Sequence, residues 1–138
     1  MVEEETIVIT ETDRACLQEM IDALDFVGEP FRGHIRELES ELRRALIVPS
    51  STVDPQVVTM SSRLRTRDLD TGEVNKFTLV YHSDSDMFDS KLSVLSSLGI
   101  RFLGARVGDV IEWSVPRGLR RLRIESIEYQ PEASGEVI

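Results

Sequence analysis

Hydrophobic residues in the first part of the chain recur with a helical period. A single stripe, spaced i, i+3, i+4 and i+7, is formed by Leu17, Met20, Ile21 and Leu24. Thr10 lies just before this stripe and Asp13 follows three residues later, a capping-box arrangement that opens a helix. The apolar run at residues 7–9 predicts a short strand ahead of that helix.

A second helical stripe follows the interruption at Gly28 and Pro30, and it consists of Ile35, Leu38, Leu42 and Leu46. We expect this helix to end at Val48, because Pro49 cannot extend it. Two helices of similar length with a short connection predict an antiparallel hairpin, or short coiled coil, over residues 1–48. A first helix of about a dozen residues is only ~18 Å long.

From residue 49 onward the pattern changes towards short runs typical of strands. Arg63, Arg65 and Arg67 alternate along one side of a predicted strand, a turn follows at residues 70–73, and residues 77–81 return. Residues 92–95 are a further short strand candidate. Ser96 and Ser97 then offer an N-cap for a brief helix that runs through Leu103 and is closed by Gly104.

Two more strands are predicted at residues 109–113 and 119–129. The apolar phase of the last strand shifts between Ile124 and Ile127, which indicates a bulge, and we expect residues 130–138 to fray. The predicted fold class is therefore α+β, with a helical hairpin at 1–48 followed by a mostly antiparallel sheet domain with one short helix at 49–138.

Composition excludes several classes of protein. Hydrophobic residues make up 41% and charged residues 30%, as in an ordinary globular protein, and no apolar stretch is long enough to cross a bilayer. The single cysteine, Cys16, cannot form an intramolecular disulfide or a Cys-rich zinc site. A net charge of −9 disfavours direct binding to nucleic acid. We expect a cytoplasmic monomer without membrane contact.

Several segments together resemble the regulator of nucleoside diphosphate kinase family, usually called Rnk. They cover roughly residues 57–133 in order and include 67–73, 78–81, 93–95 and 129–133, which makes the match specific as a set. This family is related to the GreA/GreB transcript-cleavage factors, so the resemblance implies an FKBP-like sheet domain behind a coiled coil much shorter than in Gre factors. It also implies a partner, RNA polymerase, bound near the rim of the secondary channel.

In that group of proteins the loop before the short helix supplies the main docking contact. The resemblance places this partner-binding loop at Leu95, Ser96, Ser97 and Leu98. Relatives commonly have proline at the position of Ser97 and at that of His82, so the chain departs from the family pattern at the proposed loop itself. We expect a regulator without enzyme activity, catalytic residues, bound metal or cofactor. An interaction module for another protein partner remains an alternative.

The acidic hairpin tip provides the competing hypothesis. In a Gre factor, acids at the coiled-coil tip help bind a second Mg²⁺ in the polymerase active site, a task suited to hard oxygen ligands. The corresponding region here contains Asp22, Asp25 and Glu29. We expect these acids to be solvated, because a hairpin of ~18 Å is too short to deliver them down a deep channel. They could still steer docking onto a basic rim.

Other candidate sites give weaker signals. His82, Asp84 and Asp86 alternate in a way that could bind a divalent metal, but a fourth ligand is not evident. The arginines at 63, 65, 67, 117, 120, 121 and 123 could form a basic face, although interleaved Asp68, Glu125 and Glu128 favour an ordinary charged surface. The FKBP-like fold does not by itself carry prolyl isomerase activity.

Overall fold

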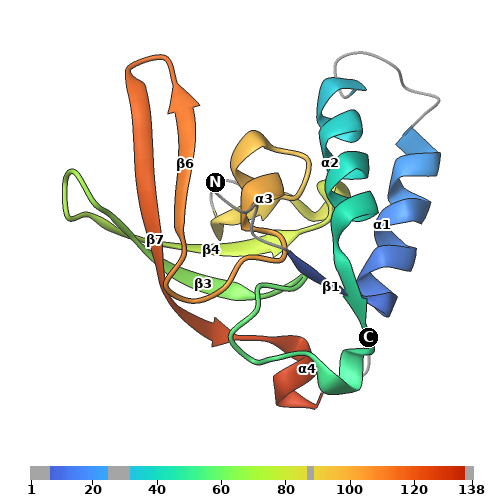
Figure 1. The fold of residues 1–138 in the computed structure, drawn as a ribbon. Helices are drawn as coiled ribbons and strands as arrows, with labels where there is room; N and C mark the ends of the chain where they lie inside the picture. Colours follow the sequence, from blue (N-terminus) through green and yellow to red (C-terminus); the bar gives the residue numbers. More distant parts are fainter. Residues whose placement is uncertain (1–6, 25–31, 87–88, 136–138) are drawn as a thin grey trace, which may run out of the picture.

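The predicted helical hairpin is present. The computed structural model describes residues 7–24, 32–86 and 89–135, and α1 (Glu11–Leu24) lies beside α2 (Arg32–Arg44) (Figure 1). The Thr10 hydroxyl accepts a hydrogen bond from the backbone N–H of Asp13 at 3.0 Å, so the N-terminus of α1 is capped as predicted. Apart from Leu46, both hydrophobic stripes turn inward, with Leu17 and Leu38 fully buried.

The second helix ends earlier than the sequence pattern predicts. It stops at Arg44, and the next residues form β2 (Leu46–Val48), which pairs in parallel with β1 (Val8–Thr10). The backbone N–H of Leu46 donates to the carbonyl of Ile7 at 2.9 Å. The β-branched residues before Pro49 therefore satisfy their backbone groups against β1 rather than in another helical turn. Leu46 is 55% exposed and is not part of the buried stripe.

The second part of the chain is a curled five-stranded sheet with the order β5-β4-β3-β7-β6. Its strands are β3 (Arg63–Asp68), β4 (Val74–Val80), β5 (Lys91–Ser93), β6 (Val110–Val115) and β7 (Gly118–Tyr129). All neighbours are antiparallel except β4 and β5. Helix α3 (Ser97–Phe102) lies against the concave side (Figure 1). This is the FKBP-like arrangement expected from the sequence, without closure into a barrel.

The predicted bulge in β7 is present and is double. Residues 124 and 126 of β7 face Thr66 and Arg65, which leaves Glu125 without a partner on β3. Residues 127 and 129 face Leu64 and Arg63, which leaves Glu128 without one. Each extra residue increases the local twist of the strand and re-aims its side chain.

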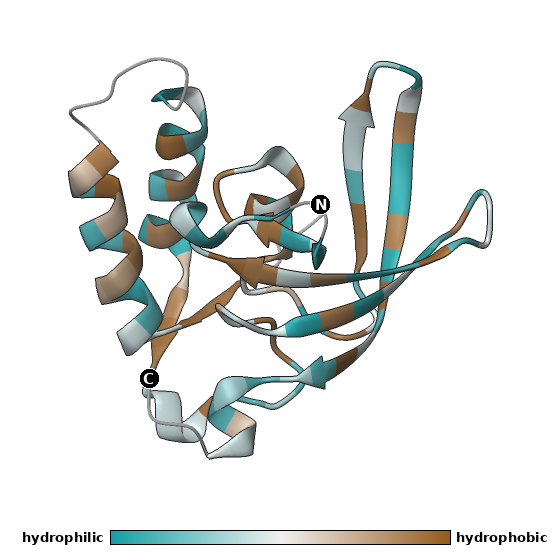
Figure 2. Cartoon of the chain, turned by 180° about the vertical axis from the view of Figure 1, so that it is seen from behind, coloured by the Kyte–Doolittle hydropathy of each residue, from teal (hydrophilic) through white to brown (hydrophobic). Residues whose placement is uncertain are grey.

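One hydrophobic core is shared by the hairpin and the sheet. Hydrophobic segments gather where the helices meet the β1–β2 pair and the end of β4 (Figure 2). Core residues that are at most 2% exposed include Ile9, Leu17, Ile21, Leu38, Leu64, Leu79, Phe102, Leu122 and Ile124. The division of the chain at residue 48 stays a prediction. No helix among the described residues is long and apolar enough to span a membrane.

The C-terminal residues up to Gly135 are ordered, so the expected fraying from residue 130 is wrong. Gln130 is 4% exposed, and its side-chain Nε2 donates to the carbonyls of Asp54 and Val57 at 2.9 and 2.8 Å. Pro131 is buried and begins α4 (Pro131–Ser134). The amide of Gln130 satisfies two backbone acceptors in the segment between the 3-10 turn η1 (Ser50–Thr52) and β3, and this anchors the tail.

Candidate docking surface

The loop before α3 is held by a compact set of hydrogen bonds. Ser96 is the N-cap of α3: its hydroxyl accepts from the Gly99 N–H at 3.0 Å and donates to the Ser93 carbonyl at 2.7 Å. The Ser93 hydroxyl in turn accepts from the Leu95 N–H at 3.0 Å. The loop therefore has one defined conformation, as the predicted Ser96 cap implies.

Burial divides the four residues of the predicted docking loop into two pairs. Leu95 and Leu98 are 2% and 6% exposed, so their side chains belong to the core. Ser96 and Ser97 are partly exposed. Because the Ser96 hydroxyl is engaged in the cap, Ser97 is the side chain of the loop that is available to a partner. The docking role of the loop stays a prediction.

Gly99 permits the tight approach of this loop to α3. A Cβ atom built at Gly99 would lie 2.0 Å from the carbonyl oxygen of Ser93, closer than any real contact. The same carbonyl accepts the hydroxyl proton of Ser96. Any larger residue at Gly99 must displace the backbone of the loop, so the shape of the candidate docking surface depends on this position.

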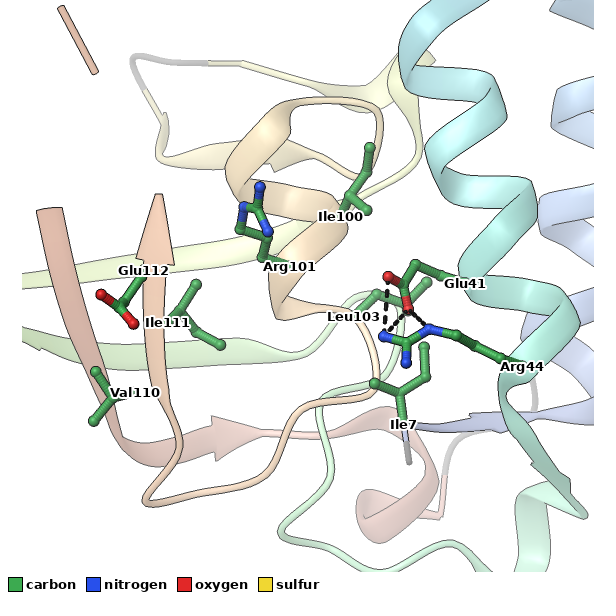
Figure 3. Close-up of a pocket in the computed structure, with 9 residues that line it drawn as sticks. All are labelled: Ile7, Glu41, Arg44, Ile100, Arg101, Leu103, Val110, Ile111 and Glu112. Carbon is green, nitrogen blue, oxygen red and sulfur yellow. Dashed lines mark hydrogen bonds and ion pairs between the residues drawn. The ribbon is translucent and has the colours of Figure 1, made fainter. Parts of the chain in front are cut away.

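A shallow pocket of about 220 Å³ lies on the other side of α3 (Figure 3). Its apolar wall is formed by Ile7, Ile100, Leu103 and Ile111. On α2, Arg44 Nε donates to Glu41 Oε2 at 2.9 Å, so these two charges neutralise each other at the rim. Arg101 of α3 also lines the pocket and is exposed. The pocket thus combines an apolar wall with four charged residues, Glu41, Arg44, Arg101 and Glu112.

The hairpin is joined to the sheet part of the chain through Asp13. Its side-chain Oδ2 accepts a hydrogen bond from the backbone N–H of Met60 at 2.9 Å, and the residue is 1% exposed. Burial raises the pKa of this carboxyl to about 6; the Met60 N–H opposes the rise, and the negative charge of Glu132 adds to it. Sequence reasoning identified Asp13 as a capping residue but missed this long-range contact.

Asp13 interacts electrostatically with Tyr81 and Glu132, and Thr59 bonds to Glu132. We call these four residues, Asp13, Thr59, Tyr81 and Glu132, the junction cluster. The Thr59 hydroxyl donates to Glu132 Oε1 at 2.7 Å. Burial raises the pKa of the Tyr81 hydroxyl, and the charge of Asp13 raises it further. The cluster brings α1, the segment before β3, the end of β4 and α4 together at one point.

The acidic hairpin tip is described only in part. Asp22 is exposed near the end of α1 and accepts a hydrogen bond from Gln18 Nε2 at 3.0 Å. Asp25 and Glu29 lie outside the described residues. The one tip acid that the structure describes is therefore a solvated side chain that contacts its own helix.

The alternating His82, Asp84 and Asp86 do not converge on a metal geometry. His82 is half-buried with its Nδ1 3.4 Å from the Ser93 hydroxyl, whereas Asp84 and Asp86 are exposed. In the described parts of the chain, His, Cys, Asp and Glu side chains do not form any group of three suited to a metal ion.

The arginines of β3 face outward and are matched by the bulged glutamates of β7. Glu125 accepts from Arg65 Nε at 3.1 Å and from Arg67 Nε at 2.7 Å. These arginines hold the pKa of the Glu125 carboxyl below its usual value, Arg67 most strongly. Glu128 pairs in the same way with Arg63 and Lys76. The predicted interpretation as an ordinary charged surface fits these pairs.

Asp68 differs from the other acids near this face, because its side chain is buried on the opposite side of the sheet. It is 0% exposed and pairs with Arg120, whose Nε donates to Asp68 Oδ2 at 2.8 Å. Its Oδ1 accepts from the N–H groups of Asp70 and Thr71. The Arg120 guanidinium lowers the pKa of Asp68, and the Asp70 N–H lowers it further. Because side chains alternate along a strand, Asp68 lies on the same face of β3 as the buried Leu64 and Thr66. Its burial could therefore have been predicted from the sequence.

Two family models match the chain in succession. The Rnk N-terminus matches residues 6–48, and the C-terminal domain of the transcription elongation factors GreA and GreB matches residues 53–129. The regulator of nucleoside diphosphate kinase of Escherichia coli K12 is 36% identical over 134 residues, which cover 96% of each chain. The chain belongs to the Rnk family. This confirms the resemblance read from the sequence.

The similarity to the curated GreA factors covers part of each protein. The transcription elongation factor GreA of Alkaliphilus oremlandii is 32% identical over 93 residues, which are 67% of this chain and 58% of that factor. Among solved structures, a GreA/GreB elongation factor from Nitrosomonas europaea is 37% identical with a TM-score of 0.77 over 90% of this chain. The Rnk-family chain is therefore a regulator of the transcription-elongation-factor type, with a GreA/GreB-like fold.

Proposed function

We propose that this Rnk-family protein binds RNA polymerase near the secondary channel and competes there with Gre-type factors, without stimulating transcript cleavage. The sheet domain, with the loop Leu95–Leu98 and α3, makes the contact. Family membership and the GreA/GreB-like fold support the choice of partner. The partly exposed Ser97 at a rigid helix start gives the loop a defined surface.

The observation that carries the absence of cleavage is the length of the hairpin. Helices of 14 and 13 residues are about 20 Å long. Strand β2 begins two residues after the end of α2 and pairs with β1. The hairpin also packs into the core of the sheet rather than projecting freely. A hairpin of this length, packed against the sheet, is too short to carry the described tip acid Asp22 to a distant reaction centre.

Competition with a Gre factor for core RNA polymerase tests the proposal. The protein should displace labelled GreA from the polymerase in proportion to its concentration, and it should not accelerate RNA hydrolysis in backtracked complexes. The variant Ser97→Arg should weaken displacement, whereas Glu73→Arg, at an exposed position in the β3–β4 turn, should not. Cleavage that the protein stimulates and that Asp22→Ala removes would establish the Gre-like alternative instead.

A further inference from the structure

The β6 strand ends the sheet with an open backbone edge. It pairs with β7 on one side, and the described residues place no strand on the other. In β7, the backbone of Ile124 bonds to Gly108 and Asp109, on the side of β6. The Arg121 carbonyl accepts a hydrogen bond from the Leu69 N–H, on the side of β3. With this phase, Ile111 faces Leu122 in a hydrogen-bonded pair. The N–H and C=O groups of Val110, Glu112 and Ser114 then point to the open edge.

This edge lacks most of the features that normally prevent strand addition. Sheets protect their edges with short strands, bulges, proline or charged side chains, lysine above all, and of these β6 has one charged residue, Glu112. The other edge strand, β5, has only three residues. β6 has six residues in regular register with β7 and contains neither proline nor lysine, and Val110 on its outer face is 42% exposed.

The open edge borders the pocket beside α3. Val110 and Glu112 line this pocket although their side chains point away from it in Figure 3, whereas Ile111 points toward α3. The wall that they contribute is thus largely backbone. An extended segment laid along β6 would place an alternate side chain beside Ile7, the partly exposed apolar residue of the wall, whereas Ile100 and Leu103 are buried at 2% and 1% exposed.

The charges of the pocket indicate the chemistry of that segment. Glu41 and Arg44 pair with each other, and Glu112 points outward. Arg101 lines the pocket without an ion pair to any described residue. An acidic side chain on the incoming segment would complete this pairing.

We propose that an extended segment of RNA polymerase, carrying an aliphatic and an acidic side chain, adds to β6 as a sixth strand and fills the pocket beside α3. This inference rests on the proposed function, because it names how the same partner is held. Arg101 lies in α3, and the docking loop leads directly into the same short helix, so a single partner can reach both. Backbone hydrogen bonds supply affinity, and the pocket and Arg101 supply selectivity.

Hydrogen exchange on the whole protein, alone and with core RNA polymerase, tests strand addition directly. The N–H groups of Glu112 and Ser114 should exchange quickly in the free protein and at least about tenfold more slowly in the complex. Ile111 and Trp113 bond to β7 and should be protected in both states, which makes them internal controls. A complex that leaves Glu112 and Ser114 unprotected would overturn the inference.

A pair of substitutions at Glu112 gives an independent measurement. Glu112→Pro removes an N–H that points away from β7, so the sheet is preserved while an incoming strand is blocked. Glu112→Thr removes the same charge and keeps the N–H. Proline should weaken polymerase binding at least about tenfold relative to threonine. Arg101→Gln should weaken it several-fold.

The outcomes separate this inference from the proposed function. Equal binding by the proline and threonine variants, with loss of binding by Ser97→Arg, would leave loop docking intact and refute strand addition. Wild-type protein that does not bind polymerase would refute both. Protection of Glu112 and Ser114 in the protein alone, together with a dimer in sedimentation, would show that a second copy covers the edge and would overturn a polymerase strand.

Discussion

The carboxylate of Asp13 and the backbone N–H of Met60 meet at 2.9 Å, 47 residues apart in the chain. The backbone N–H of Asp13 therefore takes part in the cap of α1, while its side chain bonds to the sheet part of the protein. The bond fixes the base of the hairpin relative to the segment that leads into β3. Because the Asp13 carboxyl is buried close to Glu132, its ionised form destabilises the folded protein.

Replacing Asp13 by Asn should stabilise the protein increasingly as pH rises. The pKa of Asp13 is raised from 3.8 to about 6, so its protonated form favours folding fully below about pH 4 and this contribution is lost as pH rises through 6. The loss corresponds to roughly 2–3 kcal/mol. Asparagine keeps the acceptor for Met60 and stays neutral. Urea unfolding from pH 4 to 7.5 should therefore show a growing advantage for Asp13→Asn.

The control for this prediction is Asp22→Asn, an exposed acid on the same helix. It should show no such trend relative to wild type. If the curves for Asp13→Asn and wild type ran parallel from pH 4 to 7.5, the burial of a costly charge at the junction cluster would be refuted. Asp13→Ala, which also removes the acceptor, should be less stable than Asp13→Asn at every pH by about 1–3 kcal/mol.

Arg120→Met should lower the Tm by several degrees at neutral pH, because it leaves the buried Asp68 carboxylate without its cation. The double variant Asp68→Asn with Arg120→Met should recover part of the loss. The pKa of Asp68 is lowered from 3.8, so the stability from this pair is present above about pH 4 and is lost as pH falls further. Thermal unfolding of Arg121→Met, an exposed neighbour paired with Asp70, gives the comparison and should change little.

Gly99→Ala should damage both stability and polymerase binding. The new Cβ would meet the Ser93 carbonyl at 2.0 Å, so the loop before α3 must move, at a cost of about 1–3 kcal/mol. Gly33→Ala in α2 has open space around it and should instead stabilise by about 0.5–1 kcal/mol. Denaturant unfolding measures the first effect, and displacement of GreA measures the second. Full displacement activity in Gly99→Ala would show that loop shape is not part of the contact.

Local patterns were sufficient to predict most of the fold. The helical stripe, the Thr10 cap, the Ser96 cap and the phase shift in β7 each depend on neighbours in sequence, and each is confirmed. The end of α2 was predicted wrongly because residues 46–48 suit a helix or a strand equally, and only their partner β1 decides. The inward position of Asp68 followed from strand alternation, yet its charge argued for the surface.

The candidate docking surface was harder to predict, because it depends on contacts between distant segments. The resemblance located the loop at Leu95–Leu98, but burial of the two leucines follows only from packing of α3 against the sheet. The junction cluster unites residues from four parts of the chain, and no spacing in sequence connects them. The open edge of β6 likewise depends on strand order, which single-sequence patterns leave undetermined.

Gln130 shows how a polar residue near the end of a chain can anchor it. Its Nε2 donates to the carbonyls of Asp54 and Val57, and the residue is buried. Gln130→Ala should cost about 1–3 kcal/mol, since the Val57 carbonyl loses its donor and the Asp54 carbonyl keeps only the Val57 N–H. The loss of stability should also be local, because α4 and the Thr59–Glu132 bond lie next to Gln130. The Ser134 N–H, which donates to the Gln130 carbonyl, should therefore exchange faster. Gln56→Ala, an exposed glutamine in the same region, should leave unfolding and exchange unchanged. If the two variants had equal stability and equal exchange at Ser134, the tail would be held by the burial of Pro131 and the Thr59–Glu132 bond rather than by the glutamine amide.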